Sequence, residues 1–196
     1  MLQSDEAEWS RAQASDDRAF GELFHRHHGR VFRHALRLVV VAAEADEVMA
    51  SAFFELWRRR ADVRLVDGSV LPWLLVTATQ LSRNRIRGAV RYQRLLARLP
   101  REEAVDAARS ATESLERQEL RREIGAALRR MSATDAALVT LTVLDGLTTA
   151  EAGAAVGVSP GAARMRLSRA RGRLRTLLEH SHEPAQQHRL VTGPAS

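Results

Sequence analysis

The sequence predicts an all-α protein of two small helical domains joined by a linker, the second of them a helix-turn-helix domain. The 196 residues are rich in Ala, Leu and Arg, which favour helices, and only 5% are aromatic residues, which favour strands. Apolar residues recur at helical spacing in two separate blocks of the chain. Between the blocks, residues 100–114 begin with Pro100 and have little apolar periodicity, so they predict a linker.

The chain is long enough for one ordinary domain or two small ones, and hydrophobic residues make up 45% of it. This composition favours a globular protein over a disordered one. The expected boundaries are a loose, acidic lead-in over residues 1–15, a first domain over 16–99, the linker over 100–114, a second domain over 115–179 and a flexible tail over 180–196.

Three helices are predicted in the first domain. Apolar residues at helical spacing mark the first two, over residues 20–38 and 48–60. A short loop over residues 61–68 follows them. Ser69 is expected to cap the third helix, and Pro72 falls in its first turn, where proline is tolerated.

The helices of the second domain have suitable residue types at their boundaries. Ser132 is a good N-cap, and Thr148 with Glu151 three residues later fits a capping box. Ser159 followed by Pro160 is typical of a helix start. The glycines expected at helix ends are Gly146 and Gly157.

Residues 148–175 have the layout of a helix-turn-helix, with a short helix, a tight glycine-containing turn and a basic second helix. The small Ala and Gly residues at 150–155 are expected to let the two helices cross closely. On a helical wheel, the second helix has one narrow apolar sector, arginines on both sides of it and small or flexible residues opposite. This pattern suits entry into a DNA major groove, although a solvated basic helix that binds nothing is the alternative. The candidate contacts with duplex DNA are Ser159, Gly161, Arg164, Met165, Arg166, Ser168, Arg169, Arg171 and Arg173.

The charge of the chain also favours a nucleic-acid partner. The formal net charge is +6, and all 30 basic residues are Arg. Arginine binds phosphate oxygens with two donors at once, so a basic surface made of it suits nucleic acid. A biased genome composition explains the absence of Lys, but not where the arginines cluster.

A second candidate surface lies in the first domain, where aromatic rings occur with arginine and amide side chains. Such surfaces suit unpaired bases, which stack on the rings while arginine follows the backbone. Trp73 is central on the apolar face of its helix, so we favour a core position for it. The residues of this surface are Trp57, Arg58, Arg59, Arg60, Trp73, Gln80, Arg83, Asn84, Arg85 and Arg87.

The sequence resembles the extracytoplasmic-function group of bacterial sigma factors, which keep two domains. FGELFHRHHGRVFRHALRL resembles the opening helix of their first domain, and ADEVMASAFFELWRR resembles the polymerase-binding helix. VLPWLLVTATQLSRNRIR resembles the promoter-melting and minus-ten helix, and residues 120–178 resemble the minus-thirty-five domain. These stretches cover about four-fifths of the chain in the expected order.

The resemblance implies an alternative sigma factor that attaches to RNA polymerase core, at the clamp of the largest subunit, and directs it to promoters. The helix-turn-helix residues given above would read the minus-thirty-five element, and the loop at 61–70 would capture a base that leaves the stack at the minus-ten element. The implied polymerase contacts are Asp46, Glu47, Ala50, Phe53, Phe54 and Trp57, and the implied minus-ten contacts are Arg64, Asp67, Trp73, Gln80, Arg83, Asn84 and Arg87.

The same resemblance implies promoter DNA and an anti-sigma protein as further partners, and a free protein that is a monomer. Some positions differ from the usual family pattern. Ala50 and Ser51 replace a Gln-Glu pair in the polymerase-binding helix, and Gln80 and Asn84 stand where Asn and Asp are usual. The start of the last helix, AARMR at 162–166, also differs, so its base contacts are expected to be its own.

Several other classes of protein are disfavoured. No Cys is present, which excludes disulfides and Cys-ligated zinc. His25, His27 and His28 lack the partners of a metal site and are read as surface or groove residues. We expect no cofactor, no metal and no catalytic residue, and a cytoplasmic location because the N-terminus does not resemble a signal peptide. The main alternative is a helix-turn-helix regulator that binds duplex DNA without joining polymerase; an enzyme or a pure interaction module is the second.

Overall fold

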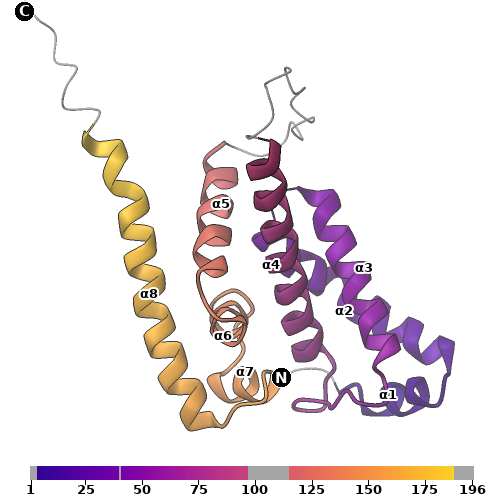
Figure 1. Cartoon of the computed structure of the whole chain (residues 1–196). Helices are drawn as coiled ribbons and strands as arrows, with labels where there is room; N and C mark the ends of the chain where they lie inside the picture. Colours follow the sequence, from indigo (N-terminus) through magenta and orange to yellow (C-terminus); the bar gives the residue numbers. More distant parts are fainter. Residues whose placement is uncertain (1–3, 40, 97–114, 188–196) are drawn as a thin grey trace, which may run out of the picture.

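The computed structural model describes residues 4–39, 41–96 and 115–187. In these ranges the fold is all-α, as predicted, with one isolated β-bridge between Val66 and Ser69. Figure 1 shows the described helices in chain order. They are α1 (Glu6–Gln13), α2 (Asp17–Leu38), α3 (Ala42–Arg58), α4 (Leu71–Leu96), α5 (Leu115–Arg129), α6 (Ala133–Val143), α7 (Thr149–Ala155) and α8 (Pro160–Gln187).

The first domain consists of α1 to α4, with α2 packed against the other three helices. Asp16 caps α2, because its carboxylate accepts hydrogen bonds from the backbone N–H groups of Arg18 and Ala19. Leu23, Leu56 and Leu74, from three different helices, are fully buried in the centre of this domain. Burying side chains of this size contributes about 1.5–3 kcal/mol each.

The N-terminal segment is more ordered than the sequence predicted. Residues 1–15 were expected to form a loose lead-in, but residues 6–13 form α1, which packs against α2. Trp9 and Ala12 are buried and supply the apolar contact. The acidic residues Glu6 and Glu8 lie in the first turn, where negative charge favours a helix.

The second domain consists of α5 to α8, and the predicted helix starts are confirmed. The Ser132 hydroxyl accepts a hydrogen bond from the backbone N–H of Asp135. Thr148 and Glu151 form the reciprocal bonds of a capping box. Ser159 accepts a bond from the N–H of Ala162, just after Pro160 opens α8.

The end of the chain differs from the expected flexible tail over 180–196, because α8 continues to Gln187. Residues 188–196 lie outside the described residues, and so does the predicted linker over 100–114. Among the described helices, none has a stretch long and apolar enough to cross a membrane.

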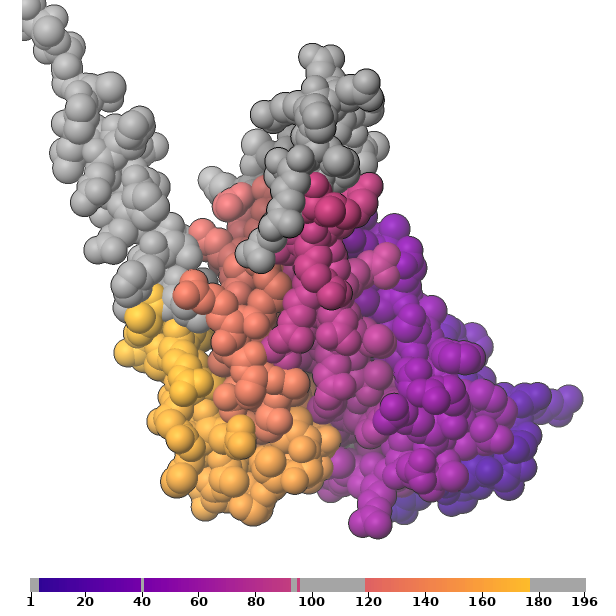
Figure 2. All heavy atoms as spheres, viewed as in Figure 1, coloured from indigo at the N-terminus to yellow at the C-terminus, as the bar shows by residue number. Residues whose placement is uncertain are grey.

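The two domains pack directly against each other along α4. Helices α5, α6 and α7 all contact α4, and α5 also contacts α2. The surfaces of α5 and α4 touch in the space-filling view (Figure 2). Ile86 of α4 lies against this contact, 3.3 Å from where a side chain at Gly125 would begin. A side chain at position 125 would require Ile86 to shift by a few tenths of an ångström, so glycine favours the close approach of α5.

Candidate nucleic-acid and polymerase interfaces

The helix-turn-helix is formed by α7, a short turn and α8. Gly157 in the turn has a φ of +74°, a conformation that favours glycine. A Cβ atom at Gly153 would lie 2.9 Å from the Cβ of Ala163, closer than such atoms approach. The two helices therefore cross at a distance that requires a glycine on α7, as the run of small residues at 150–155 predicted.

The N-terminal half of α8 presents the predicted faces. Ala163, Leu167 and Ala170 are buried, and Met165 on the opposite face is 63% exposed. Arg166 is partly buried. The other predicted duplex contacts are all exposed: Ser159, Gly161, Arg164, Met165, Ser168, Arg169, Arg171 and Arg173.

Three arginines on one flank of α8 gather around a shallow pocket of about 200 Å³. Arg166, Arg169 and Arg173 line it together with Asp135 of α6. The Asp135 carboxylate lies 3.1 Å from Nη1 of Arg166 and fixes that side chain beside the helix. One carboxylate does not balance three guanidinium groups, so this flank suits phosphate oxygens.

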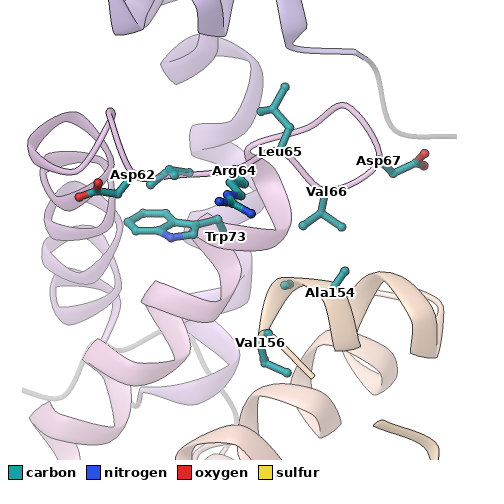
Figure 3. A pocket seen from close by; sticks show the side chains of 11 residues that line it. Asp62, Arg64, Leu65, Val66, Asp67, Trp73, Ala154 and Val156 are labelled. Atoms are coloured by element: carbon teal, nitrogen blue, oxygen red, sulfur yellow. The ribbon is translucent and has the colours of Figure 1, made fainter. Parts of the chain in front are cut away.

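A larger pocket, of about 600 Å³, lies between the two domains. On one side are the loop from Asp62 to Asp67 and Trp73 at the start of α4, and on the other is the end of α7 with Ala154 and Val156 (Figure 3). Arg64 and Trp73 lie close together in this view, whereas Asp67 points away from them. A ring beside a guanidinium is the combination that stacks an unpaired base.

Trp73 is half-buried, so it belongs both to the edge of the core and to the pocket wall. The loop beside it ends in a tight turn, in which Val66 and Ser69 exchange backbone hydrogen bonds of 3.0 and 3.1 Å. The two middle residues, Asp67 and Gly68, have φ values of 50° and 69°. This is the geometry of a type I′ turn, which holds the loop in one shape.

The predicted polymerase-binding helix, α3, presents an exposed face. Asp46, Glu47, Ala50 and Phe54 are exposed and recur about four residues apart, so they share one side of the helix. Phe54 is 65% exposed, which is unusual for so large an apolar side chain. Arg85 of α4 pairs with the carboxylate of Glu47.

The sequence matches two family models. Residues 23–92 match Sigma-70 region 2, and residues 121–174 match Sigma-70 region 4. The chain is 35% identical to the RNA polymerase sigma factor CarQ of Myxococcus xanthus over 162 residues, 82% of this chain and 89% of CarQ. It is 30% identical to the ECF RNA polymerase sigma factor SigE of Mycolicibacterium smegmatis over 171 residues, 86% of this chain and 65% of SigE.

The chain belongs to the extracytoplasmic-function sigma factors. It is an alternative sigma factor that directs transcription initiation, and its family consists of DNA-binding initiation factors rather than enzymes in themselves. The region 2 match over the first domain is what a simple helix-turn-helix regulator lacks. The fold is similar to that of CnrH, solved in complex with the cytosolic domain of CnrY, with a TM-score of 0.59, 23% identity and coverage of 91% of this chain and 99% of that chain.

One predicted polymerase contact of this sigma factor is buried, and another is half-buried. Phe53 was expected to touch polymerase, but it is 3% exposed and its ring packs 4.8 Å from that of Phe24. The face of α3 that carries Phe54 is the one exposed to solvent. Trp57 is half-buried, between the ring of Phe20 at 5.0 Å and the guanidinium of Arg60 at 4.3 Å.

Arg83 was expected to point outward toward DNA, but it lies buried between the domains. Its Nη2 donates to the carbonyl of Met131 at 2.5 Å, and its Nε donates to that of Leu128 at 3.2 Å. Desolvation lowers the pKa of Arg83, and the nearby charge of Arg87 lowers it further. The guanidinium thus caps the end of α5, where cations are favoured. The other predicted contacts on α4, Gln80, Asn84 and Arg87, are exposed, as is Arg64 in the loop.

His27 was read as a surface residue, but it is buried and its Nε2 lies 2.8 Å from the carboxylate of Asp5. The sequence contained a signal for this, because His27 continues the four-residue spacing of Leu23 and Val31. No comparable signal identified Asp5. His25 and His28 are exposed, and the described residues contain no group of three or more His, Cys, Asp or Glu that could hold a metal ion.

Proposed function

We propose that this sigma factor binds RNA polymerase core through α3 and reads promoters at two elements, minus ten and minus thirty-five. The observation that carries the proposal is the pairing of two surfaces in one chain. The helix-turn-helix exposes a recognition helix flanked by arginines, and the first domain combines an exposed apolar residue on α3 with a pocket formed by Arg64 and Trp73.

At the minus-thirty-five element, the first turns of α8 enter the major groove. Gly161 and Met165 let the helix approach the base edges, and Arg164 is the candidate for a bidentate contact with guanine, worth about 1–3 kcal/mol of discrimination. Arg169 and Arg173, on the other flank, neutralise phosphates and add affinity without sequence preference.

At the minus-ten element, the loop at 61–70 and the face of α4 bind the strand that opens. Extruding a base costs a few kcal/mol, and stacking on a ring returns about 1–3 kcal/mol, so a pocket formed by Trp73 and Arg64 offsets the cost of holding the extruded base. Gln80, Asn84 and Arg87 follow the strand along α4. The end of α7 forms the opposite wall of this pocket.

The partner of α3 is the polymerase clamp. Phe54 supplies an apolar anchor, and Asp46 and Glu47 supply charges that complement a basic surface. Because polymerase performs the chemistry, this chain needs no cofactor, metal or catalytic group of its own. A partner of polymerase acts in the cytoplasm, which is the proposed location of this protein. An anti-sigma protein that covers Phe54 would use the same surface and hold the sigma factor inactive. Without either partner, the sigma factor is a monomer.

The first test is whether the purified protein co-elutes with sigma-free RNA polymerase core. We expect co-elution by the unaltered protein, and a loss of about thirtyfold or more in affinity with Phe54→Ala, because truncation of a central anchor costs about 2 kcal/mol or more. Val143→Ala is the matched control, since Val143 is also an exposed apolar residue but lies on α6. Tight binding to duplex DNA without any co-elution would contradict the proposal and favour a simple regulator.

A further inference from the structure

Asp5 is a fully buried carboxylate that joins the N-terminus to the loop before α4. It accepts hydrogen bonds from Ser69 Oγ at 2.7 Å, Val70 N at 2.9 Å, His27 Nε2 at 2.8 Å and Arg26 Nη1 at 2.7 Å. Its backbone N–H donates to the carbonyl of Gly68 at 2.7 Å. Both the main chain and the side chain of Asp5 are therefore bonded to the end of the loop.

The direction of the Asp5 carboxylate is informative. Asp5 occupies the N-cap position of α1, where an aspartate usually accepts a bond from its own helix. Here the side chain makes no such cap, and it is directed to the loop instead. Trp9 and Ala12 already pack α1 into the core, and the Asp5 side chain joins the end of the loop to Arg26 and His27 of α2.

The other end of the same segment is also bonded to α1. The side-chain amide of Gln13 donates to the carbonyl of Arg60 at 2.8 Å, where α3 has just ended. Arg60 in turn donates to the hydroxyl of Ser15 at 3.1 Å. Helix α1 thus holds the loop at its beginning through Gln13 and at its end through Asp5.

Arg64 and Asp67 lie between these two anchored ends, and Trp73 follows in the first turn of α4. The turn at Gly68 lies close to the N-terminal segment, since a Cβ there would be in van der Waals contact with Ser4 Oγ at 3.4 Å and Glu6 Oε1 at 3.5 Å. The loop is therefore held by contacts with a segment that lies outside the region 2 match over residues 23–92, in addition to its own turn.

We propose that Asp5 is a positioning residue for promoter reading, which anchors the loop at 61–70 so that Arg64 and Trp73 are held ready for a base of the opened minus-ten strand. The inference rests on the proposed function of that loop. It adds α1 to the promoter-reading part of the protein, through Asp5 at one end and Gln13 at the other.

The test uses holoenzyme assembled from sigma-free core and the full chain, with duplex DNA containing a long randomised stretch. Duplexes that stay bound after a heparin challenge are sequenced, and base preference is measured in the upstream and downstream windows. We expect Asp5→Asn to reduce preference in the downstream window about tenfold, the scale of one lost charge-assisted hydrogen bond. Upstream preference and affinity for core should change less than about twofold, because the helix-turn-helix and α3 do not contact Asp5.

Glu8→Gln is the matched control, since it removes the same charge from α1 at a carboxylate that pairs with Arg26. It should leave both windows unchanged. If Asp5→Asn does not fold, Gln13→Ala tests the exposed anchor at the other end and should also weaken only the downstream preference.

Three results would overturn the inference. Unchanged downstream preference in folded Asp5→Asn or Gln13→Ala would show that the loop does not depend on α1. An equal loss in both windows and in core affinity would indicate a purely structural role. If the unaltered protein forms no holoenzyme, the proposed function fails first, and the inference fails with it.

Discussion

The imidazole of His34 lies 2.5 Å, Nδ1 to Oδ2, from the carboxylate of Asp145, and this contact joins the two domains. Nε2 of the same ring lies 2.8 Å from the hydroxyl of Thr79, which is 3.1 Å from that of Thr140. His34 and Thr79 belong to the first domain, and Asp145 and Thr140 to the second. A chain of buried polar groups therefore runs across the boundary, and each group depends on its partners to offset its desolvation.

Replacing His34 should destabilise the contact between the domains. His34→Ala removes the closest partner of Asp145 and leaves a space in a buried site, so we expect a loss of about 1–3 kcal/mol in the free energy of unfolding. Urea denaturation measures this value, with His25→Ala as the control because His25 is exposed. If the unfolding free energies of both variants lay within about 0.5 kcal/mol of that of the unaltered protein, His34 would not join the domains as its contacts require.

The crossing of α7 and α8 gives a second prediction. Gly153→Ala places a Cβ 2.9 Å from that of Ala163, and the nearest backbone atom is 3.3 Å away, so the helices must separate. We expect a loss of about 1–3 kcal/mol in stability and weaker duplex binding. Gly172→Ala meets nothing within 4 Å and should stabilise α8 slightly, by up to about 1 kcal/mol. Thermal unfolding that ranks the two variants in the opposite order would exclude the close crossing.

The stability of the protein should depend on pH through Asp5. Burial raises the pKa of this carboxyl, but hydrogen bonds from His27, Ser69 and Arg26 outweigh it and lower the pKa from 3.8 to about 2. Because the folded-state pKa is depressed, the stabilisation is fully present above pH 3.8 and is lost as the pH falls through about 2. A shift of this size corresponds to about 2 kcal/mol.

Asp5→Asn, which cannot ionise, provides the comparison. The difference in unfolding free energy between the unaltered protein and this variant should be largest near pH 5 and should shrink as the pH falls toward 2. Arg26 stays charged over this range, so the change reports on the carboxyl itself. A difference that stays constant between these pH values would mean that the Asp5 carboxyl does not titrate as its contacts require.

The two flanks of α8 should behave differently in DNA binding. Arg164→Ala should weaken minus-thirty-five binding by about 1–3 kcal/mol and relax base preference at one or two positions. Arg173→Ala should weaken binding to all sequences alike and reduce the salt dependence by about one unit of slope. Titrations of matched and scrambled duplexes at several salt concentrations separate these effects. Identical behaviour of the two variants would remove the distinction between base and phosphate contacts.

The sequence predicted best what depends on neighbouring residues. The caps at Ser132 and Ser159 and the capping box at Thr148 each involve a partner three residues away, so their local pattern is sufficient. The apolar sector of α8 and the close crossing at Gly153 followed from spacing and side-chain size in the same way.

The errors arose where a partner lies far away in the chain. Arg83 was expected to face DNA, but its acceptor carbonyls are at Leu128 and Met131, 45 and 48 residues later. Asp5 finds Ser69 at a separation of 64 residues. No local pattern contains these partners, so tertiary packing had to supply them. Phe53 is different, because it continues the helical spacing of Val48, Ala52 and Leu56, and its burial could have been predicted from that stripe.

The most direct test of the account is transcription by sigma-free RNA polymerase core, with and without this protein, from a genomic DNA library. The 5′ ends of the transcripts are sequenced. If the protein reads two promoter elements, it should produce a new set of start sites, each preceded by two shared sequence motifs at constant spacing. These start sites should disappear with Phe54→Ala. With Arg164→Ala, the upstream motif should be only weakly conserved among them. Transcripts identical to those from core alone, or new start sites that share a single motif, would contradict it.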